Sequence, residues 1–353
     1  MRASDVCGDL DGIVALAIGA KRYGWVAPTM TDASSIVYIE NGRHPLQELA
    51  VPQYIPNDCY LGGCSGHRER RDRQTEGPND GPDHGRNVLV LTGPNHSGKS
   101  IYLRQVALIV YLAHIGSFVP AQRATVGVTD RILTRMTTKE GVCRSESAFS
   151  IDLRQMAFAT ELVTRRSLVL VDEFGKGTQT EDGIALMAAL IDNLASRRSE
   201  APLVLAATNH HELFEPGVLK MGSNIALAHM DAHIDVGNKI SDDKLVFLYA
   251  LVPGKASTSF GVRCAAINGV DTDVVQRAEE ITALLDSQKD LQSACIKLSD
   301  GEVRRLEKAE VVARRFLAVD LFQVHSMDGQ DGSAQQGHRK GLVGLCMECM
   351  DAC

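Results

Sequence analysis

The feature that most restricts the fold of this chain is a glycine-rich loop between two apolar segments. Before the loop, Val88–Leu91 is a continuous apolar run, typical of a strand buried on both faces of a parallel sheet. After it, Ser100–Ile115 carries apolar side chains almost all round a helix, so this helix is expected to be buried on most of its surface. A strand, a loop and a buried helix in this order predict an α/β fold. The loop fits the pattern G-x-x-x-x-G-K-[ST] with Gly93, Pro94, Asn95, His96, Ser97, Gly98, Lys99 and Ser100.

Each part of this loop suits a nucleotide triphosphate. Glycines permit the tight turn that aims successive N–H groups at a phosphate, and the helix that follows presents free amides and the positive end of its dipole. Lys99 would place a cation against the β- and γ-phosphates, and the Ser100 hydroxyl would ligate Mg²⁺. The alternative is a chance glycine-rich turn, which the flanking strand and helix argue against. The loop, with Ile101, is therefore the predicted site for ATP and Mg²⁺.

A second apolar strand ends in two carboxylates. Residues 168–171 are Leu-Val-Leu-Val, and Asp172 and Glu173 follow them. An acid at the carboxyl end of such a strand points into the crevice where α/β sheets bind ligands. Asp172 is therefore predicted to hold Mg²⁺ together with Ser100, and Glu173 to polarise the attacking water. The alternative is that the two acids only begin a solvated loop.

Strands and helices alternate along much of the chain. This alternation predicts a largely parallel sheet with helices on both faces. Its further segments are strands at 35–40, 167–171 and 203–207 and a helix at 183–195. Helical apolar spacing also predicts helices over 4–24, 274–285 and 302–317.

Composition separates one segment from the rest and excludes some classes of function. Residues 59–86 are rich in Gly, Pro, Asp and Arg, so a flexible surface insertion is expected there. Its basic run at 67–71 is interpreted as solvated loop, with a nuclear address or a DNA contact as the alternative. The net charge of −7 excludes a uniformly basic surface, so any DNA contact must be local or come from a partner. No run approaches the ~18 apolar residues of a membrane span.

The nine cysteines are scattered, and no signal peptide precedes them. This usage predicts reduced, intracellular thiols, among them Cys7, Cys143, Cys264 and Cys295. Residues 346 and 349 have the C-x-x-C spacing of zinc ligands, but a structural zinc takes four ligands and no second pair is present. Free thiols are therefore favoured in the tail.

Together these segments resemble the MutS family of DNA-repair and recombination ATPases, over about residues 1–290. The resemblance implies a P-loop NTPase of the ABC-ATPase type, a DNA-dependent ATPase in which Tyr54 stacks on adenine and Tyr249 lies nearby. It also implies a dimer, in which Ser147 of one subunit closes over the γ-phosphate held by the other. The motifs that carry it are Gly42–Pro45, Tyr54–Asn57, Gly93–Gln105, Gly116–Ala121, Ser145–Phe149 and Asp172–Thr178.

One position departs from the common pattern of the family. Most members carry a histidine that contacts the γ-phosphate where this chain has Asn209. This asparagine and the variant motif Asp172–Thr178 are similar to the meiotic branch, that of the fifth MutS homologue of eukaryotes. Membership of that branch would imply a nuclear heterodimer with the fourth homologue, acting on branched recombination intermediates in meiotic crossing-over. Asparagine donates a hydrogen bond but cannot shuttle a proton, so a catalytic set of Glu173, Lys99 and Asn209 is expected to hydrolyse ATP slowly.

The resemblance also implies domain limits. They are the end of a lever helix at 1–30, the ATPase domain at 31–270, a helical dimerisation element at 271–325 and a disordered tail at 326–353. The DNA-encircling regions of the family would precede residue 1, so we expect a fragment of a longer protein that reaches double-stranded or branched DNA through those regions. Two other functions stay open: a mismatch-repair ATPase, and a nucleotide-gated DNA-binding scaffold with little hydrolysis.

Overall fold

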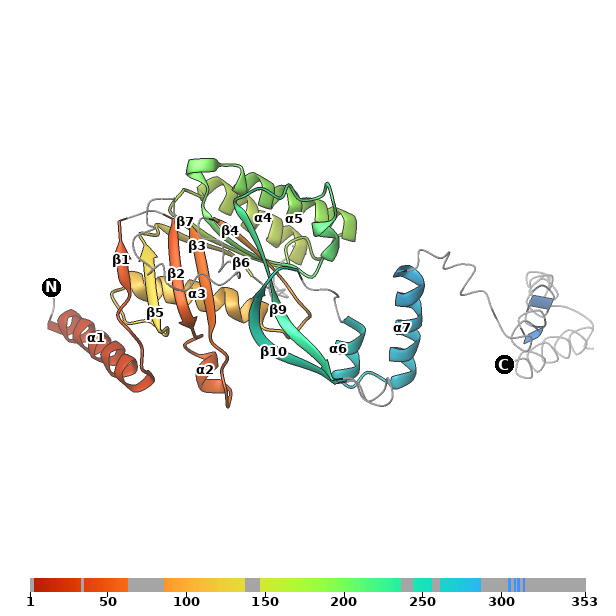
Figure 1. Ribbon diagram of the computed structural model, residues 1–353, viewed down its shortest axis with the longest axis horizontal. Coiled ribbons are helices and arrows are strands. Elements are labelled where there is room, and N and C mark those ends of the chain that lie inside the picture. The colour runs from red at the N-terminus through yellow and green to blue at the C-terminus, as the bar shows by residue number, and fades with distance from the viewer. Residues whose placement is uncertain are drawn as a thin grey trace, which may run out of the picture. The chain divides into compact units, whose positions relative to one another are not determined.

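The computed structural model describes residues 3–32, 35–62, 86–136, 147–235, 244–255 and 261–286, with isolated positions between 304 and 314. Contacts between Cα atoms divide the chain into two units, Met1–Thr272 and Asp273–Cys353. The first unit contains two sheets and their helices (Figure 1). The second contains nearly all of α7 (Thr272–Asp286), which confirms the helix expected over 274–285. The helix expected over 302–317 lies mostly outside the described residues, and the tail wholly so.

A six-stranded sheet is the centre of the first unit. Its order is β10-β9-β4-β8-β7-β6, and its neighbours pair parallel except β9 with β10. Every residue of β4, β7 and β8 is buried, as their continuous apolar runs predict. The largely parallel sheet is therefore confirmed. The bounds are β4 Val88–Thr92, β6 Arg131–Arg135, β7 Ser167–Asp172, β8 Leu203–Ala207, β9 Ile225–Asp235 and β10 Lys244–Pro253.

Helices cover both faces of this sheet. Successive strand residues point to opposite faces, so Leu89 and Leu91 pack in one apolar cluster and Val88 and Val90 in another. The first cluster contains side chains of α3, and the second contains side chains of α4 and α5. The bounds are α3 Lys99–His114, α4 Ala148–Leu162 and α5 Thr180–Ala195.

A second sheet, of four strands, lies on the other side of α3. Its order is β1-β5-β2-β3, and its residues Val37, Ile39 and Leu61 share the first apolar cluster with Leu103 of α3. Helix α3 is therefore enclosed between two sheets, which explains why its sequence is apolar almost all round. The sequence predicted one of these strands, β2. The bounds are β1 Thr29–Thr31, β2 Ile36–Gly42, β3 Asn57–Gly62 and β5 Arg123–Gly127.

The flexible insertion expected at residues 59–86 was placed too early. Residues 59–62 belong to β3, which pairs antiparallel with β2, and Cys59 and Leu61 are each 1% exposed. Their alternating apolar pattern is short, and the polar composition that follows conceals it. At the other end, the guanidinium of Arg86 donates to the carbonyl of Ile225. Residues 63–85 lie outside the described part of the chain.

Helix α1 (Ala3–Tyr23) confirms the helix expected over 4–24. The guanidinium of Arg43 donates to the carbonyl of Tyr23 at 3.2 Å, which joins the end of α1 to the segment after β2. None of the described helices is both long and apolar enough to cross a membrane. The remaining short elements are α2 Gln47–Ala50, η1 Arg198–Glu200, η2 His211–Phe214 and α6 Gly261–Ile267.

Truncating an inward side chain of α3 should destabilise the first unit strongly. Leu103 is fully buried between the two sheets, so Leu103→Ala should lower the free energy of unfolding by about 2–5 kcal/mol. Tyr111 lies on the same helix and is 54% exposed, so Tyr111→Ala should cost less than about 1 kcal/mol. Urea unfolding followed by circular dichroism measures both. Equal costs for the two variants would contradict the enclosed position of α3.

Candidate nucleotide site

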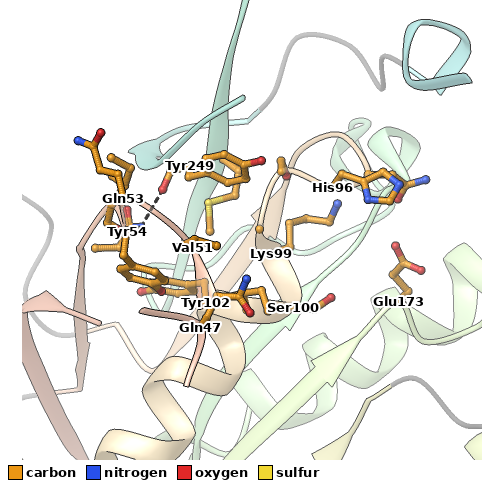
Figure 2. Close-up of a pocket in the computed structure, with 17 residues that line it drawn as sticks. Gln47, Val51, Gln53, Tyr54, His96, Lys99, Ser100, Tyr102, Glu173 and Tyr249 are labelled. Atoms are coloured by element: carbon orange, nitrogen blue, oxygen red, sulfur yellow. Dashed lines mark hydrogen bonds between the residues drawn. The ribbon is translucent and has the colours of Figure 1, made fainter. Parts of the chain in front are cut away.

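A pocket of about 510 Å³ lies beside the start of α3 (Figure 2). It is lined by the predicted loop from Asn95 onward, by Tyr54 and its neighbours, by Met230 and Tyr249 from β9 and β10, and by Glu173. Segments that are far apart in the sequence therefore meet in one cavity. The predicted loop, the predicted stacking residue and the acid after β7 all contribute to it.

The backbone of the loop requires its two glycines. Gly93 has a φ of +138° and Gly98 a φ of +101°, values that side-chain-bearing residues rarely adopt. A Cβ on Gly93 would also lie 3.0 Å from Oγ of Ser97 and 3.2 Å from Cβ of Met230. Gly98 immediately precedes α3, so its left-handed conformation turns the chain into the helix. Pattern and geometry agree at both positions.

Lys99 lies inside the loop, as the first residue of α3. Its side chain is 5% exposed, and Nζ donates to the carbonyls of Gly93 at 2.7 Å and Pro94 at 3.0 Å. Burial lowers the pKa of Lys99, and the charges of Glu173 and Asp172 oppose this shift. A buried ammonium beside free amides at a helix N-terminus is an environment that favours an anion.

The structure brings Ser100 and Asp172 together. The Ser100 side chain lies close enough to the Asp172 carboxylate to act on its pKa, while Oδ1 of Asp172 is buried without a hydrogen-bond partner among the described residues. Burial raises the pKa of Asp172, and the nearby Ser100 hydroxyl counteracts part of that shift. Mg²⁺ takes oxygen ligands, of which the protein commonly supplies one or two. A hydroxyl next to a carboxylate with an unpartnered oxygen fits such an ion.

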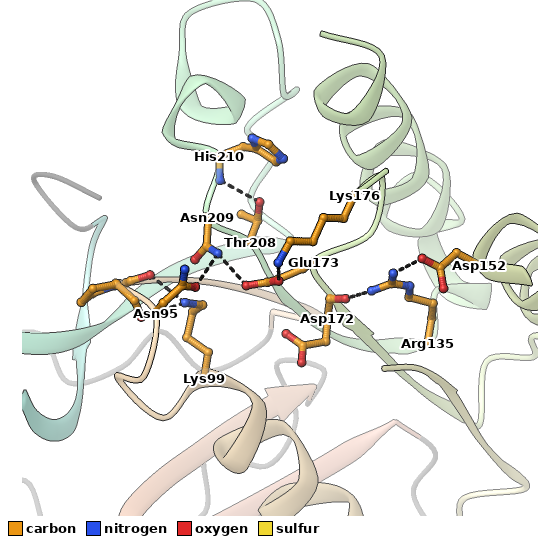
Figure 3. Close-up of polar contacts among 12 residues, drawn as sticks. Asn95, Lys99, Arg135, Asp152, Asp172, Glu173, Lys176, Thr208, Asn209 and His210 are labelled. Atoms are coloured by element: carbon orange, nitrogen blue, oxygen red, sulfur yellow. Dashed lines mark hydrogen bonds and ion pairs between the residues drawn. The ribbon is translucent and has the colours of Figure 1, made fainter. Parts of the chain in front are cut away.

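Glu173 follows β7 in a left-handed conformation, with a φ of +51°. Its Oε1 accepts from Nδ2 of Asn209 at 2.5 Å, and its Oε2 accepts from Nζ of Lys176 at 2.5 Å (Figure 3). Burial raises the pKa of Glu173, but the hydrogen bond and charge of Lys176, with smaller effects of Lys99 and Asn209, hold it below its ordinary value. A lowered pKa weakens a carboxylate as a proton acceptor.

Asn209 connects the loop with Glu173. Its Nδ2 donates both to Glu173 and to Oδ1 of Asn95 at 2.9 Å. The amide nitrogen must face Glu173, because an ionised carboxylate only accepts hydrogen bonds. The next residue, His210, is held by its backbone N–H, which donates to Oγ1 of Thr208. Figure 3 shows its side chain pointing away from Lys99 and Glu173.

Ser147 lies outside this pocket. It is the N-cap of α4, where its Oγ accepts from the backbone N–H of Ser150 at 3.2 Å, and it is not among the residues that line the pocket. The loop after Glu173 lies against the same end of α4, because a Cβ on Gly177 would be 3.5 Å from Cβ of Phe149. Of the Ser145–Phe149 motif, the first two residues lie outside the described part of the chain.

Three residues beside the site were missed by the sequence interpretation. Lys176 was noted only as part of a motif, although it pairs with Glu173. Arg135, 5% exposed, donates to the carboxylate of Asp152 on α4 and to the main-chain carbonyl of Asp172 (Figure 3). This arginine ties the end of β6 to the end of β7 and to α4. A cation at the carboxyl end of a strand was the available signal, but β6 itself was not predicted.

The thiols can be compared with expectation at three positions. Cys7, Cys59 and Cys264 are free, and Sγ of Cys264 lies 3.7 Å from the carbonyl oxygen of Asn95 in the loop. Two of the four thiols named from the sequence are thus described, and both are unpaired. Cys143, Cys295 and the tail cysteines lie outside the described residues.

The family model for MutS domain V matches residues 89–286, the segment that contains most of this pocket. The chain belongs to the MutS family. MutS protein homolog 5 of Saccharomyces cerevisiae is 35% identical over 326 residues, which are 89% of this chain and 35% of that protein. The DNA mismatch repair protein MutS of Oleidesulfovibrio alaskensis is 37% identical over 292 residues, 81% of this chain and 28% of its own length.

The mismatch repair protein MutS of Synechococcus elongatus is similar to the same degree, at 38% identity over 300 residues, 84% of this chain and 30% of that protein. This member of the MutS family thus spans about a third of the length of the curated relatives that it matches. The family resemblance expected from the motifs is confirmed.

Replacing the buried carboxylate of Asp172 by an amide should raise thermal stability. Because the pKa of Asp172 is raised in the fold, its ionised form destabilises the folded state at pH values above the pKa of an unfolded aspartate. Asp172→Asn should therefore raise Tm at pH 7 in the presence of a chelator. The gain should shrink as the pH falls, because the wild-type carboxyl then becomes neutral.

Scanning fluorimetry at pH 7 and pH 5 measures this difference. The exposed Asp11 on α1 offers a matched control, and Asp11→Asn should leave Tm within about 1 °C. A lower Tm for Asp172→Asn at pH 7 would contradict the unfavourable burial of its charge.

Proposed function

We propose that the chain binds ATP with Mg²⁺ in this pocket and hydrolyses it, as the ATPase part of a MutS-type protein. The observation that carries the proposal is the convergence of three predicted elements on one cavity. The loop with Lys99 and Ser100, the ring of Tyr54, and Glu173 all line it. Asp172, which is not among the lining residues, presents an unpartnered oxygen behind Ser100. Members of the MutS family are ATPases, which agrees with this assignment.

The residues divide the work between binding and hydrolysis. Amides of the loop and the ammonium of Lys99 hold the β- and γ-phosphates, and Tyr54 offers a ring to the adenine. Ser100 and Asp172 hold Mg²⁺, which neutralises charge on the phosphate oxygens when it is bound. Glu173 orients and polarises the attacking water, and Asn209 positions Glu173 against the loop.

Two substitutions test this assignment. Lys99→Ala removes a charge-assisted contact, so ATP affinity should fall about 10- to 150-fold. Glu173→Gln should keep ATP affinity within about threefold and abolish phosphate release, because it removes the acceptor for the proton of water. Equilibrium binding of a fluorescent ATP analogue and a phosphate-release assay measure the two effects.

The exposed Lys220 supplies the control for the loss of a lysine, since Lys220→Ala should bind ATP as the wild type does. If Lys99→Ala were to bind ATP with undiminished affinity, the phosphate site would have to lie elsewhere.

The second candidate function is a nucleotide-gated scaffold with little turnover. It is favoured by the contacts of Glu173, both of whose oxygens accept short hydrogen bonds while its pKa lies below the ordinary value. Lys176→Gln should remove the main cause of that lowering. Since Glu173 must be ionised to act, loss of turnover on acidification should then begin at a higher pH than in the wild type.

The pH dependence of kcat for the wild type and Lys176→Gln decides between the two functions. A wild type that binds ATP and releases no phosphate at any pH would favour the scaffold. Turnover in both proteins with the expected displacement of the acidic limb would favour the ATPase.

We propose further that Ser147 acts on nucleotide held by a second subunit. Support comes from its place at the exposed start of α4, outside the pocket of its own chain. The similarity to homolog 5 of yeast over 89% of the chain favours a heterodimer with another MutS homologue, the fourth. It also favours a nuclear role in meiotic recombination, on branched DNA reached through regions beyond this chain.

The same proposal includes three further expectations. They are the ABC type of the fold, the domain limits near residues 30 and 270, and a dimerisation role for the helices that follow. The bacterial relatives are about as similar to this chain, so mismatch repair is the alternative. Binding of the assembled heterodimer to a four-way junction and to a mismatched duplex separates the two.

Association with the fourth homologue should depend on Ser147. With Glu173→Gln to prevent hydrolysis, Mg²⁺ and ATP should promote a complex visible in sedimentation velocity. Adding Ser147→Ala should weaken this complex about 5- to 30-fold, because a donor to the terminal phosphate is lost. Ser196→Ala, after α5, is the control for the loss of a serine hydroxyl. Undiminished association of the Ser147 variant would contradict action across the interface.

A further inference from the structure

We infer that Gln105 and Asn57 are positioning residues that fix the spacing between the two aromatic side chains at the base end of the pocket, Tyr54 and Tyr249. The inference rests on the proposed binding of ATP and adds to it a reason why the pocket would accept the base as well as the phosphates. Both tyrosines lie at the end of the pocket remote from Glu173 (Figure 2).

The first aromatic side chain is held by the helix of the loop. The hydroxyl of Tyr54 donates to Oε1 of Gln105 at 2.7 Å, and Gln105 is fully buried on α3. Burial raises the pKa of Tyr54 to about 12, so its hydroxyl keeps the proton that it donates. The same helix begins with Lys99 and Ser100. The position of Tyr54 is therefore fixed by the same rigid helix that carries the residues proposed to bind the phosphates.

The second aromatic side chain lies on an irregular part of β10. The pairing of β9 with β10 shifts register between Phe247 and Leu251, and Tyr249 between them has a φ of +53°. Such an irregularity leaves backbone groups without partners in the ladder. The side chain of Asn57 supplies partners, since Nδ2 donates to the carbonyl of Tyr249 at 2.8 Å and Oδ1 accepts from the N–H of Leu251 at 2.7 Å.

The bond from Asn57 also affects the side chain of Tyr249. It holds Tyr249 where its ring contacts the loop, because a Cβ added to Gly98 would lie 3.3 Å from Cδ1 of that ring. The strained backbone of Tyr249 and the close approach to Gly98 thus have one common support. Without Asn57, neither the bulge nor the ring would have a fixed place.

A single hydrogen bond joins the two supports. Nε2 of Gln105 donates to the main-chain carbonyl of Asn57 at 3.2 Å. The resulting chain runs from Tyr54 through Gln105 and Asn57 to Tyr249, across the segment before β3, α3, β3 and β10. Buried polar networks whose members all have partners are rigid. The distance between the two rings is therefore set before any ligand enters.

The side chain of Asn57 has no remaining N–H group with which to donate a hydrogen bond to a molecule in the pocket. Both protons of its Nδ2 are taken, one by the carbonyl of Ile55 at 3.2 Å and one by that of Tyr249. Gln105 is not among the residues that line the pocket. The effect of Gln105 on a nucleotide must therefore pass through other residues. Asn57 does line the pocket, but its side-chain hydrogen bonds go to the backbone around the two tyrosines. Preorganised walls of this kind lower the cost of ordering on binding.

The test compares ATP with inorganic triphosphate, which has phosphates and no base. Isothermal titration with Mg²⁺ measures both affinities for the wild type, Tyr54→Phe, Gln105→Met and Asn57→Ala. Removing a support leaves partners unpaired, so the ratio of ATP affinity to triphosphate affinity should fall about 5- to 30-fold for Gln105→Met and Asn57→Ala. Tyr54→Phe keeps the ring and removes only the hydroxyl, so a fall of about 3- to 10-fold is expected.

Tyr38→Phe is the matched control. It removes a tyrosine hydroxyl that donates to the carbonyl of Gly62 at 2.9 Å within the four-stranded sheet. This bond lies away from the pocket, so the ratio of ATP affinity to triphosphate affinity should equal that of the wild type. Tyr54→Phe removes one hydroxyl group and leaves the packing of the ring intact. It therefore decides the question if Gln105→Met and Asn57→Ala do not fold.

The outcomes separate the inference from the proposed function. A wild type that binds triphosphate and ATP equally well would overturn the inference and leave the phosphate site standing. Parallel loss of both affinities in Tyr54→Phe would also overturn it, because the network would then act on the whole site. A wild type that binds neither ligand would overturn the proposed function and the inference with it.

Discussion

The enclosure of α3 between two sheets is the constraint on which the rest of the molecule depends. Apolar side chains on both sides of the helix are buried in one cluster, so it can neither slide nor rotate without opening the core. Its polar residues are consequently fixed as well. Lys99 faces into the loop, Ser100 meets Asp172, and Gln105 holds Tyr54. One buried helix thereby sets together the places of the residues proposed to hold the phosphates, the metal ion and the base.

Parallel pairing gathers the remaining groups at one edge of the large sheet. The strands β4, β8 and β7 are neighbours and run in the same direction, so their carboxyl ends meet. The loop, Asn209 and the acidic pair follow those three ends. The backbone N–H of Glu173 donates to the carbonyl of Ala207 at 2.9 Å, and this bond continues the contact between β7 and β8 beyond the ladder. Side chains that lie on separate loops are thus kept within hydrogen-bond distance.

Among the strands of the large sheet, the sequence predicted those that are buried on both faces and missed those that are partly exposed. Strands β4, β7 and β8 are continuous apolar runs, but β6 (Arg131–Arg135) has only one buried residue among exposed and partly buried ones, and in the small sheet β3 is short and borders a polar segment. Within the site, pattern alone located Lys99 and Asp172. It could not reveal that Lys176 and Asn209 bind the same carboxylate, because that contact depends on the left-handed backbone of Glu173, which no spacing encodes.

The bond between Asn57 and Tyr249 connects residues 192 positions apart in the chain. Contacts of such high sequence separation require long loops to close, and this closure costs chain entropy before the contact contributes any stabilising energy. The strand and helix on either side of the phosphate loop are adjacent in the sequence, whereas the second aromatic side chain reaches the pocket only when β9 has paired with β4 and β10 with β9. Under the proposed function, capture of a complete nucleotide is therefore a property of the finished molecule. Through mass action, the ligand would selectively stabilise chains whose last strand is in place.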